Sequence, residues 1–190
     1  MKKVNTLEFS VLLCKSLYIL IALMAIGATV IFIHLQMDPL YYTRWNVSFL
    51  TQKGILSYSF FESWHTDHTK ANSLIALDKI KVTSLYFNYL QIIGILTLIF
   101  LTVKEFLKVI ESVKLIETFH QRNILSFQKM CKYLFVIFIL SSITIVNAQE
   151  ANLYSYSLRF TPIILSLAAL IMAEIFKQGN QLLEENQLTI

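Results

Sequence analysis

Long apolar runs separated by polar stretches dominate this chain. They cover residues 16–35, 85–103, 133–148 and 160–176. An α-helix rises about 1.5 Å per residue, so roughly 20 apolar residues cross the hydrocarbon core of a bilayer. The pattern therefore predicts an all-α membrane protein, a bundle of four transmembrane helices that forms a single integral membrane domain over residues 1–190.

Residues that start and stop helices flank the fourth run. Thr161 is a good N-cap, and Pro162 is tolerated in a first helical turn. Gly179 is typical of a helix C-terminus and follows the cationic Lys177, whose charge suits that end. We expect the helix to end at Gly179 and a polar cytoplasmic tail to cover residues 180–190.

The loop between the first two runs, residues 38–81, contains two stretches in which apolar and polar residues alternate. These are residues 45–49 and 56–60, and turn-forming residues 51–54 lie between them. Alternation with a period of two is typical of a half-buried strand. We expect a β-hairpin that lies against the helix ends or the lipid surface, because an isolated two-stranded ribbon is marginal in water. The polar residues 147–158 are expected to form a tight turn.

A charged connector, residues 104–132, separates the second and third runs. In its first half the apolar residues fall on one side of a helical wheel, and Lys104, Glu105 and Lys108 fall on the other. The second span is therefore expected to continue as an amphipathic helix, and a capping box over residues 118–121 is expected to start the next helix. The connector either docks a soluble partner or anionic lipid heads, or its two helix extensions shield each other's apolar faces.

Positive residues are unevenly distributed along the chain. If the N-terminus is cytoplasmic, ten of the sixteen Lys and Arg residues lie on the cytoplasmic side. Lys and Arg near span ends favour that side of a membrane. We therefore expect a multi-pass protein of the cell membrane with both termini and the connector in the cytoplasm and residues 38–81 outside.

Composition agrees with this class. The chain is 56% apolar and 15% charged, whereas a typical soluble domain is about 25% charged. A net charge of +4 does not indicate direct nucleic-acid binding. The two cysteines, Cys14 and Cys131, are too few for a disulfide framework, and we expect both to pack inertly.

Two amides stand out within the second apolar run. Asn88 and Gln91 lie one helical turn apart, and the hydroxyl residues Ser141, Ser142 and Thr144 lie in the third run. Amides inside a bilayer need hydrogen-bond partners, so this intramembrane polar stripe is expected to face the bundle and bond to another span. The alternative is a polar lining for a substrate path, but the charged midplane residues that mark ion-coupled transport are missing.

The outer loop holds one weak candidate for a metal site. His65, Asp67 and His68 have a spacing that suits metal ligands if the segment is helical, but no further ligand is identifiable. The alternative is a solvated loop end, and we expect no cofactor. Glycine-rich phosphate loops, a Ser-His-Asp arrangement and a His-Glu-x-x-His helix are absent from the sequence. We therefore expect the protein not to be an enzyme.

The C-terminal residues resemble the closing signature of a bacterial membrane family, the domain of unknown function 2975. The similar residues are 173–179, 182–185 and 188–190, together with Phe119 and Asn123 in the connector. The resemblance implies four spans and an intracellular connector. It also implies a link to transcription, because some relatives are encoded beside a small helix-turn-helix regulator, and it offers no catalytic residue to carry over.

Two classes of function follow. The first is a non-enzymatic regulatory or sensory membrane protein that couples the membrane to a cytoplasmic partner such as a helix-turn-helix transcription regulator. The second is a small transporter or channel subunit, which would need to form a homo-oligomer because four spans are too few for a pore. The candidates for partner docking are Phe119, Asn123, Glu174, Lys177, Gly179, Glu184 and Glu185.

Overall fold

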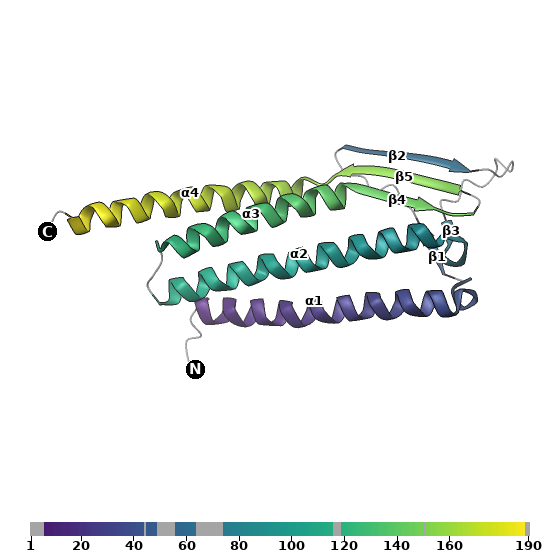
Figure 1. Cartoon of the computed structure of the whole chain (residues 1–190), viewed down its shortest axis with the longest axis horizontal. Coiled ribbons are helices and arrows are strands. Elements are labelled where there is room, and N and C mark those ends of the chain that lie inside the picture. The colour runs from purple at the N-terminus through teal and green to yellow at the C-terminus, as the bar shows by residue number, and fades with distance from the viewer. Residues whose placement is uncertain are drawn as a thin grey trace. The chain divides into compact units, whose positions relative to one another are not determined.

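Four long helices dominate the structure, a computed structural model that describes residues 6–43, 45–48, 56–63, 74–115, 119–149 and 151–188 (Figure 1). The helices are α1 (Thr6–Met37), α2 (Val82–Lys114), α3 (Gln121–Ser142) and α4 (Phe160–Leu188). All four are long and apolar enough to cross a membrane. The predicted fold class, an all-α bundle of four candidate spans, is therefore confirmed.

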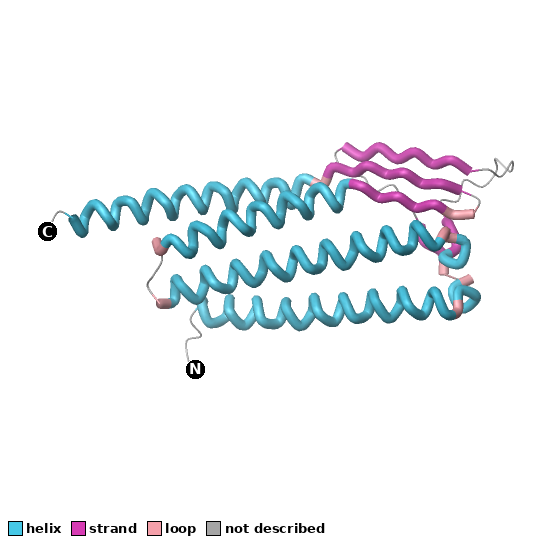
Figure 2. Tube along the Cα trace, in the orientation of Figure 1, coloured by secondary structure: helices cyan, strands magenta, loops and turns pink. Residues whose placement is uncertain are grey.

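Short strands and turns of 3₁₀-helix accompany the helices in the described segments (Figure 2). The elements are η1 (Pro39–Tyr42), β1 (Asn46–Ser48), β2 (Leu56–Ser63), β3 (Leu74–Ala76), η2 (Leu77–Lys79), β4 (Ile143–Asn147) and β5 (Ala151–Leu158). One antiparallel sheet has the strand order β2-β5-β4, and β1 pairs with β3. A small hairpin, formed by β4 and β5, therefore does accompany the helices.

The strands of the loop do not pair as the sequence predicted. Val47 of β1 lies opposite Ile75 of β3, and Tyr58 of β2 lies opposite Tyr156 of β5, so β1 and β2 do not form one hairpin. Strand β2 instead forms eight residue pairs with β5, from Leu56 opposite Leu158 onward. A partner of matching length satisfies the backbone of an eight-residue strand better than the three-residue β1 does.

The third and fourth spans end at different places from those predicted. Helix α3 stops at Ser142, and residues 143–147 form β4, because the β-branched run from Ile143 to Val146 favours a strand. The predicted turn over residues 147–158 is mostly strand β5. Helix α4 does not stop at Gly179 but continues to Leu188, since the residues after Gly179 are good helix formers.

Contacts divide the chain into two compact units. Unit 1 consists of residues 1–22, 96–138 and 160–190, and unit 2 consists of residues 23–95 and 139–159. The core of unit 1 lies between α2, α3 and α4, and its buried members are Val109, Ile124, Phe127, Met130, Ala169, Ala173 and Phe176. Unit 2 contains the strands, the end of α1 and the start of α2.

Candidate functional site

The amides of α2 in unit 2 bond to the backbone where α3 ends. A helix leaves its last carbonyls without intrahelical partners. Gln91 Nε2 donates to the carbonyl oxygens of Leu140, at 2.5 Å, and Ile143, at 2.6 Å. Asn88 Nδ2 donates to the carbonyl oxygen of Ile145 at 2.9 Å. The polar stripe therefore satisfies backbone acceptors at the junction of α3 and β4.

Ser84 bonds to the same segment as the two amides, and this role of Ser84 was not predicted from the sequence. Its buried hydroxyl donates to the carbonyl oxygen of Ile145 at 3.1 Å and accepts from the backbone N–H of Asn147 at 3.1 Å. Ser84, Asn88 and Gln91 are spaced four and three residues apart, which places them on one helix face. That spacing is the signal that could have found Ser84.

The acceptors of these amide hydrogen bonds are not the hydroxyl groups of the third run. Ser141 and Ser142 lie in the last turn of α3 and Thr144 lies in β4, but Asn88 and Gln91 donate to main-chain oxygens instead. The amide protons are thus already used within unit 2. A substrate path would need such donors to be available to a solute.

A second polar cluster joins α2 and α3 in unit 1. Glu105 is 6% exposed, and its carboxylate accepts from Lys108 Nζ at 2.6 Å and from Ser126 Oγ at 2.8 Å. The sequence placed Glu105 on the polar side of the connector helix, which is wrong, because its carboxylate is buried against Ser126. Burial alone would raise the pKa of Glu105, but the hydrogen bonds from Lys108 and Ser126 and the charges of Lys108 and Lys129 lower it overall.

Asn123 of the family signature is a packing residue in this cluster. It is 1% exposed, and its Nδ2 donates to Ser112 Oγ on α2 at 2.9 Å. Since the side chain is buried, it has no surface to offer a partner in this structure. Its observable role is to join α2 to α3.

Phe119 and Gly179 of the signature also pack on each other. The Phe119 ring lies 5.6 Å from the Phe176 ring, and the Phe176 ring lies 5.0 Å from that of Phe127. A Cβ atom at position 179 would overlap the Phe119 ring. Gly179 is therefore the residue that admits Phe119 to the side of α4, and it does so within a continuous helix rather than at its end.

The remaining docking candidates lie on the surface of α4. Glu174 and Lys177 form an exposed ion pair at 3.5 Å. Glu184 accepts from Asn180 Nδ2 at 2.7 Å, one turn away, and Glu185 is exposed next to it. The signature thus separates into a buried part that holds the helices together and an exposed acidic part that remains accessible.

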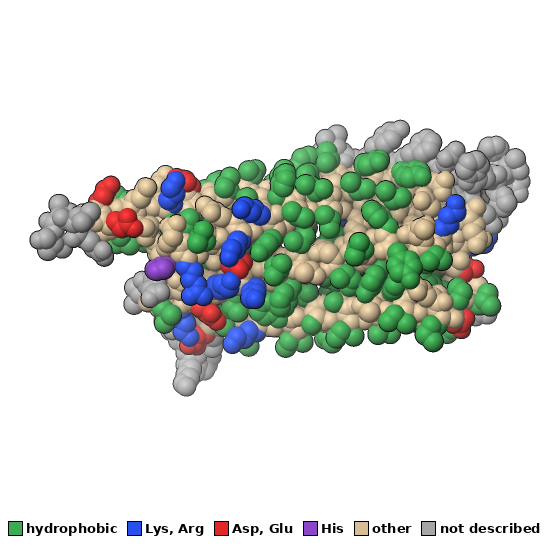
Figure 3. All heavy atoms as spheres, in the orientation of Figure 1, with side chains coloured by type: hydrophobic (Ala, Val, Ile, Leu, Met, Phe, Trp, Pro, Cys, Tyr) green, Lys and Arg blue, Asp and Glu red, His purple; other side chains and the backbone are tan. Residues whose placement is uncertain are grey.

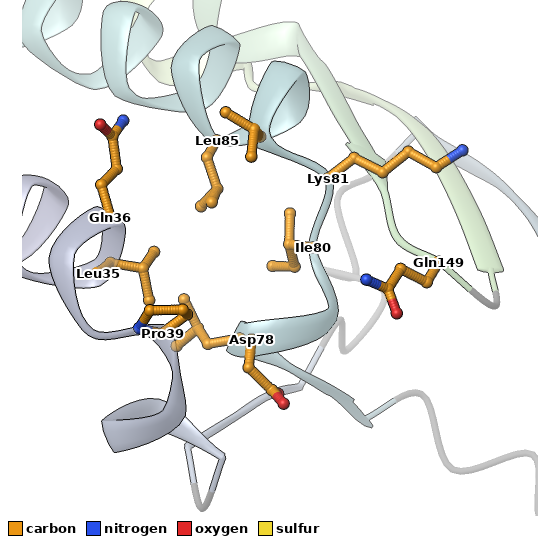
Figure 4. A pocket seen from close by; sticks show the side chains of 10 residues that line it. Leu35, Gln36, Pro39, Asp78, Ile80, Lys81, Leu85 and Gln149 are labelled. Carbon is orange, nitrogen blue, oxygen red and sulfur yellow. The ribbon is translucent and has the colours of Figure 1, made fainter.

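A cavity of about 400 Å³ lies in unit 2 (Figure 4). It lies at the end of α1 and the start of α2, beside the turn that joins β4 to β5. Its apolar lining is formed by Leu35, Pro39, Leu77, Ile80, Val82 and Leu85, and its polar lining by Gln36, Asp78, Lys81 and Gln149.

The weak metal candidate of the outer loop, His65, Asp67 and His68, lies outside the described residues. Among the residues that the structure does describe, no group of three or more His, Cys, Asp or Glu side chains is placed to hold a metal ion.

Within the part of the chain that the structure describes, four helices are long and apolar enough to cross a membrane, which places the protein in the class of multi-pass membrane proteins. Within that class, the chain belongs to the family described as "Protein of unknown function (DUF2975)", whose model matches residues 66–190. Comparison with curated proteins and with solved structures gave no significant match.

Proposed function

We propose that this protein is a non-enzymatic regulatory or sensory protein of the bacterial inner membrane. Both termini and the connector lie in the cytoplasm, where the protein engages a soluble partner such as a small helix-turn-helix transcription regulator. The partner couples to the membrane through the last turns of α4. The observation that carries this proposal is the helical continuation of α4 as far as Leu188.

The end of α4 has the properties of a docking helix. From Phe176 to Leu188 a helix extends about 18 Å. Leu182 and Leu183 are 60% and 48% exposed there, next to the acidic pair Glu184 and Glu185. Apolar anchors beside charges of one sign are typical of a helix that enters a groove on a partner with a basic rim.

Positive charge in unit 1 supports the cytoplasmic assignment. Figure 3 shows Lys and Arg side chains gathered over α2 and α3 near the connector. Lys104, Lys129 and Lys132 are exposed, and Lys108 is partly exposed. Such residues are retained on the cytoplasmic side and also attract anionic lipid heads, so membrane lipid is a second partner.

A photo-crosslinking amino acid at position 182 of the full-length protein tests the proposal in native membranes. Its matched control is the same probe at position 164, because Ile164 lies on the same helix and is also 60% exposed. We expect position 182 to capture one cytoplasmic protein, the helix-turn-helix regulator, and position 164 to capture lipid only. We expect Glu184→Lys with Glu185→Lys to weaken that capture at least tenfold.

Capture of no soluble protein at position 182 would contradict the proposal. The alternative, a small oligomeric transporter or channel subunit, predicts solute flux in liposomes that falls when Asn88 or Gln91 is replaced. Flux of this kind together with a failed capture would establish the alternative.

A further inference from the structure

A patch of positive charge covers one side of the α2–α3 pair in unit 1. Figure 3 shows Lys and Arg side chains gathered on one face of the molecule over these two helices. The basic patch consists of Lys104 and Lys108 on α2 and of Lys129 and Lys132 on α3. Ammonium groups concentrated on two neighbouring helices attract a negatively charged ligand.

The buried contact between Glu105 and Ser126 determines which way the two pairs of lysines face. The Ser126 hydroxyl on α3 donates to the Glu105 carboxylate on α2 at 2.8 Å. The two helices run antiparallel (Figure 1), and each residue turns about 100° around its helix axis. Counted from this contact, both lysines of α2 turn to the same side of the pair as both lysines of α3. The members of the basic patch therefore share one face.

Salt bridges within the patch leave most of its charge uncompensated. Lys108 Nζ lies 2.6 Å from Glu105 Oε1, and the charge of Lys129 also acts on this carboxylate. One cation from each helix is thus close to the same carboxylate. Within the described part of the chain, Lys104, Lys129 and Lys132 form no salt bridge. The face therefore keeps positive charge that a bound anion would neutralise.

Exposed apolar side chains continue this face on the membrane side of the patch. On α2, Phe100 is exposed one turn before Lys104. On α3, Val136 is exposed one turn after Lys132. Residues four apart lie on the same helix face, and Lys104 and Lys132 are also the charges that flank the second and third apolar runs. The cations thus lie at the border of the hydrocarbon core, with an apolar surface directly beyond them.

We propose that the basic patch binds the head group of an anionic phospholipid. The phosphate lies among the ammonium groups of the two helices, and the acyl chains lie along Phe100 and Val136. An acidic protein segment would match the charge of the patch but not the apolar surface beyond it, whereas basic pockets between transmembrane helices bind acidic lipid head groups. The inference rests on the proposed function in taking membrane lipid as a partner, and it adds the lipid class and the residues that hold it.

Native mass spectrometry of the full-length protein in detergent micelles tests the site by lipid titration. The probes are dioleoylphosphatidylglycerol and dioleoylphosphatidylcholine, which have the same acyl chains and differ in the net charge of the head group. We expect phosphatidylglycerol to bind at least tenfold more tightly than phosphatidylcholine. Equal affinity for the two lipids would overturn the proposal.

Soluble glycerol phosphate distinguishes a lipid site from a site for small anions. It has the phosphate and a glycerol of the phosphatidylglycerol head group but no acyl chain. We expect a large excess of glycerol phosphate to leave phosphatidylglycerol bound, because it cannot cover the apolar surface beside the patch. Displacement of the lipid would show that the patch binds free anions and would overturn the assignment to a phospholipid.

Charge removal tests the assigned residues. Lys104→Gln with Lys129→Gln removes one cation from each helix. Each Lys near an anionic lipid surface contributes a factor of about five in affinity, so we expect a loss of roughly 25-fold for phosphatidylglycerol and little change for phosphatidylcholine. The matched control, Lys114→Gln with Lys177→Gln, removes the same charge from two exposed lysines of unit 1 that each pair with a glutamate. Equal losses in the two double variants would show that net charge, and not the patch, attracts the lipid.

Arginine variants keep the test independent of folding. Lys104→Arg with Lys129→Arg replaces the same side chains but retains both charges, and guanidinium groups also bind phosphate. We therefore expect this variant to bind phosphatidylglycerol as tightly as the unmodified protein. A loss as large as that of the glutamine variant would refute the assigned charge contacts.

The outcomes separate this site from the proposed function. Equal affinity for the two lipids with intact capture at position 182 would remove only the lipid site. Tighter binding of phosphatidylglycerol with no captured protein would remove only the proposed coupling to a cytoplasmic partner.

Discussion

In unit 2 the half-buried amides of α2 bond to backbone carbonyls where α3 ends. In unit 1, by contrast, the buried polar side chain of Glu105 on α2 bonds to a side chain on a continuous stretch of α3. Gln91 and Asn88 belong to the first kind, and Glu105 with Ser126 belongs to the second. The difference determines whether a mutation can remove both partners of a hydrogen bond or only one. Both members of a side-chain pair can be replaced by apolar groups, but a backbone carbonyl cannot be replaced.

Loss of the unit 2 amide is expected to have the largest effect. Gln91→Leu leaves the carbonyls of Leu140 and Ile143 without their donor, which we expect to lower the free energy of unfolding by about 3 kcal/mol. Reversible unfolding in mixed micelles, followed by circular dichroism, measures it. The control Gln36→Leu removes an exposed hydrogen bond from Tyr86 and should lower the free energy of unfolding by no more than about 0.5 kcal/mol. Equal losses of stability in the two variants would contradict the special role of the Gln91 amide.

Gly179→Val is expected to come next, because its side chain would overlap the Phe119 ring. Overpacking of this kind costs about 2 kcal/mol. Gly27→Val makes the same change at a helical glycine with open space around its Cβ position. A lower unfolding temperature for Gly179→Val alone supports the packing role of the signature glycine, and equal temperatures for both variants would refute it.

A double-mutant cycle measures the interaction energy of the buried side-chain pair in unit 1. Glu105→Leu and Ser126→Ala each remove one member of a buried hydrogen bond of 2.8 Å. We expect the double variant to be more stable than the sum of the single changes by about 1.5 kcal/mol, since a hydrogen bond to a charged group is worth roughly that much. The same micelle unfolding measurement gives the coupling, and additive losses would show that the pair does not interact.

The smallest effect is expected at the exposed ion pair of α4. Glu174→Gln removes the partner of Lys177, but both side chains are more than half exposed, and exposed pairs contribute about 0–1 kcal/mol. Stability should therefore change little. A large drop in unfolding temperature would mean that Glu174 has a structural role that its surface position does not indicate.

The sequence predicted the apolar helices well and the strands poorly. Runs such as residues 16–35 predict a membrane-spanning helix directly, because length and hydropathy are read from the run itself and do not depend on distant residues. The apolar run that continues through Ile143 and Val146 does not report where helix gives way to strand, because periodicity cannot separate a buried strand from a buried helix. The pairing of β2 with β5 joins segments far apart in the chain, so no local signal encodes it.

The candidate site was predicted in part. The spacing of Asn88 and Gln91 predicted amides that bond to another span, and in the structure they donate to carbonyl oxygens of α3 and β4. The acceptors could not be predicted, because every residue has a main-chain carbonyl and the sequence does not mark which ones are used. Burial of Glu105 was missed because its partner Ser126 lies 21 residues away. The signature residues Phe119 and Gly179 were identified from a resemblance, and only the structure brings them into contact.

The orientation of the chain is the claim on which the proposed partner depends, and cysteine labelling in spheroplasts tests it most directly. In a background of Cys14→Ala and Cys131→Ser, single cysteines replace the exposed residues Glu185, at the end of α4, and Tyr156, in β5. We expect a membrane-impermeant maleimide to label position 156 in intact spheroplasts and position 185 only after lysis. Labelling of position 185 in intact spheroplasts would place the end of α4 outside the cell and contradict the account.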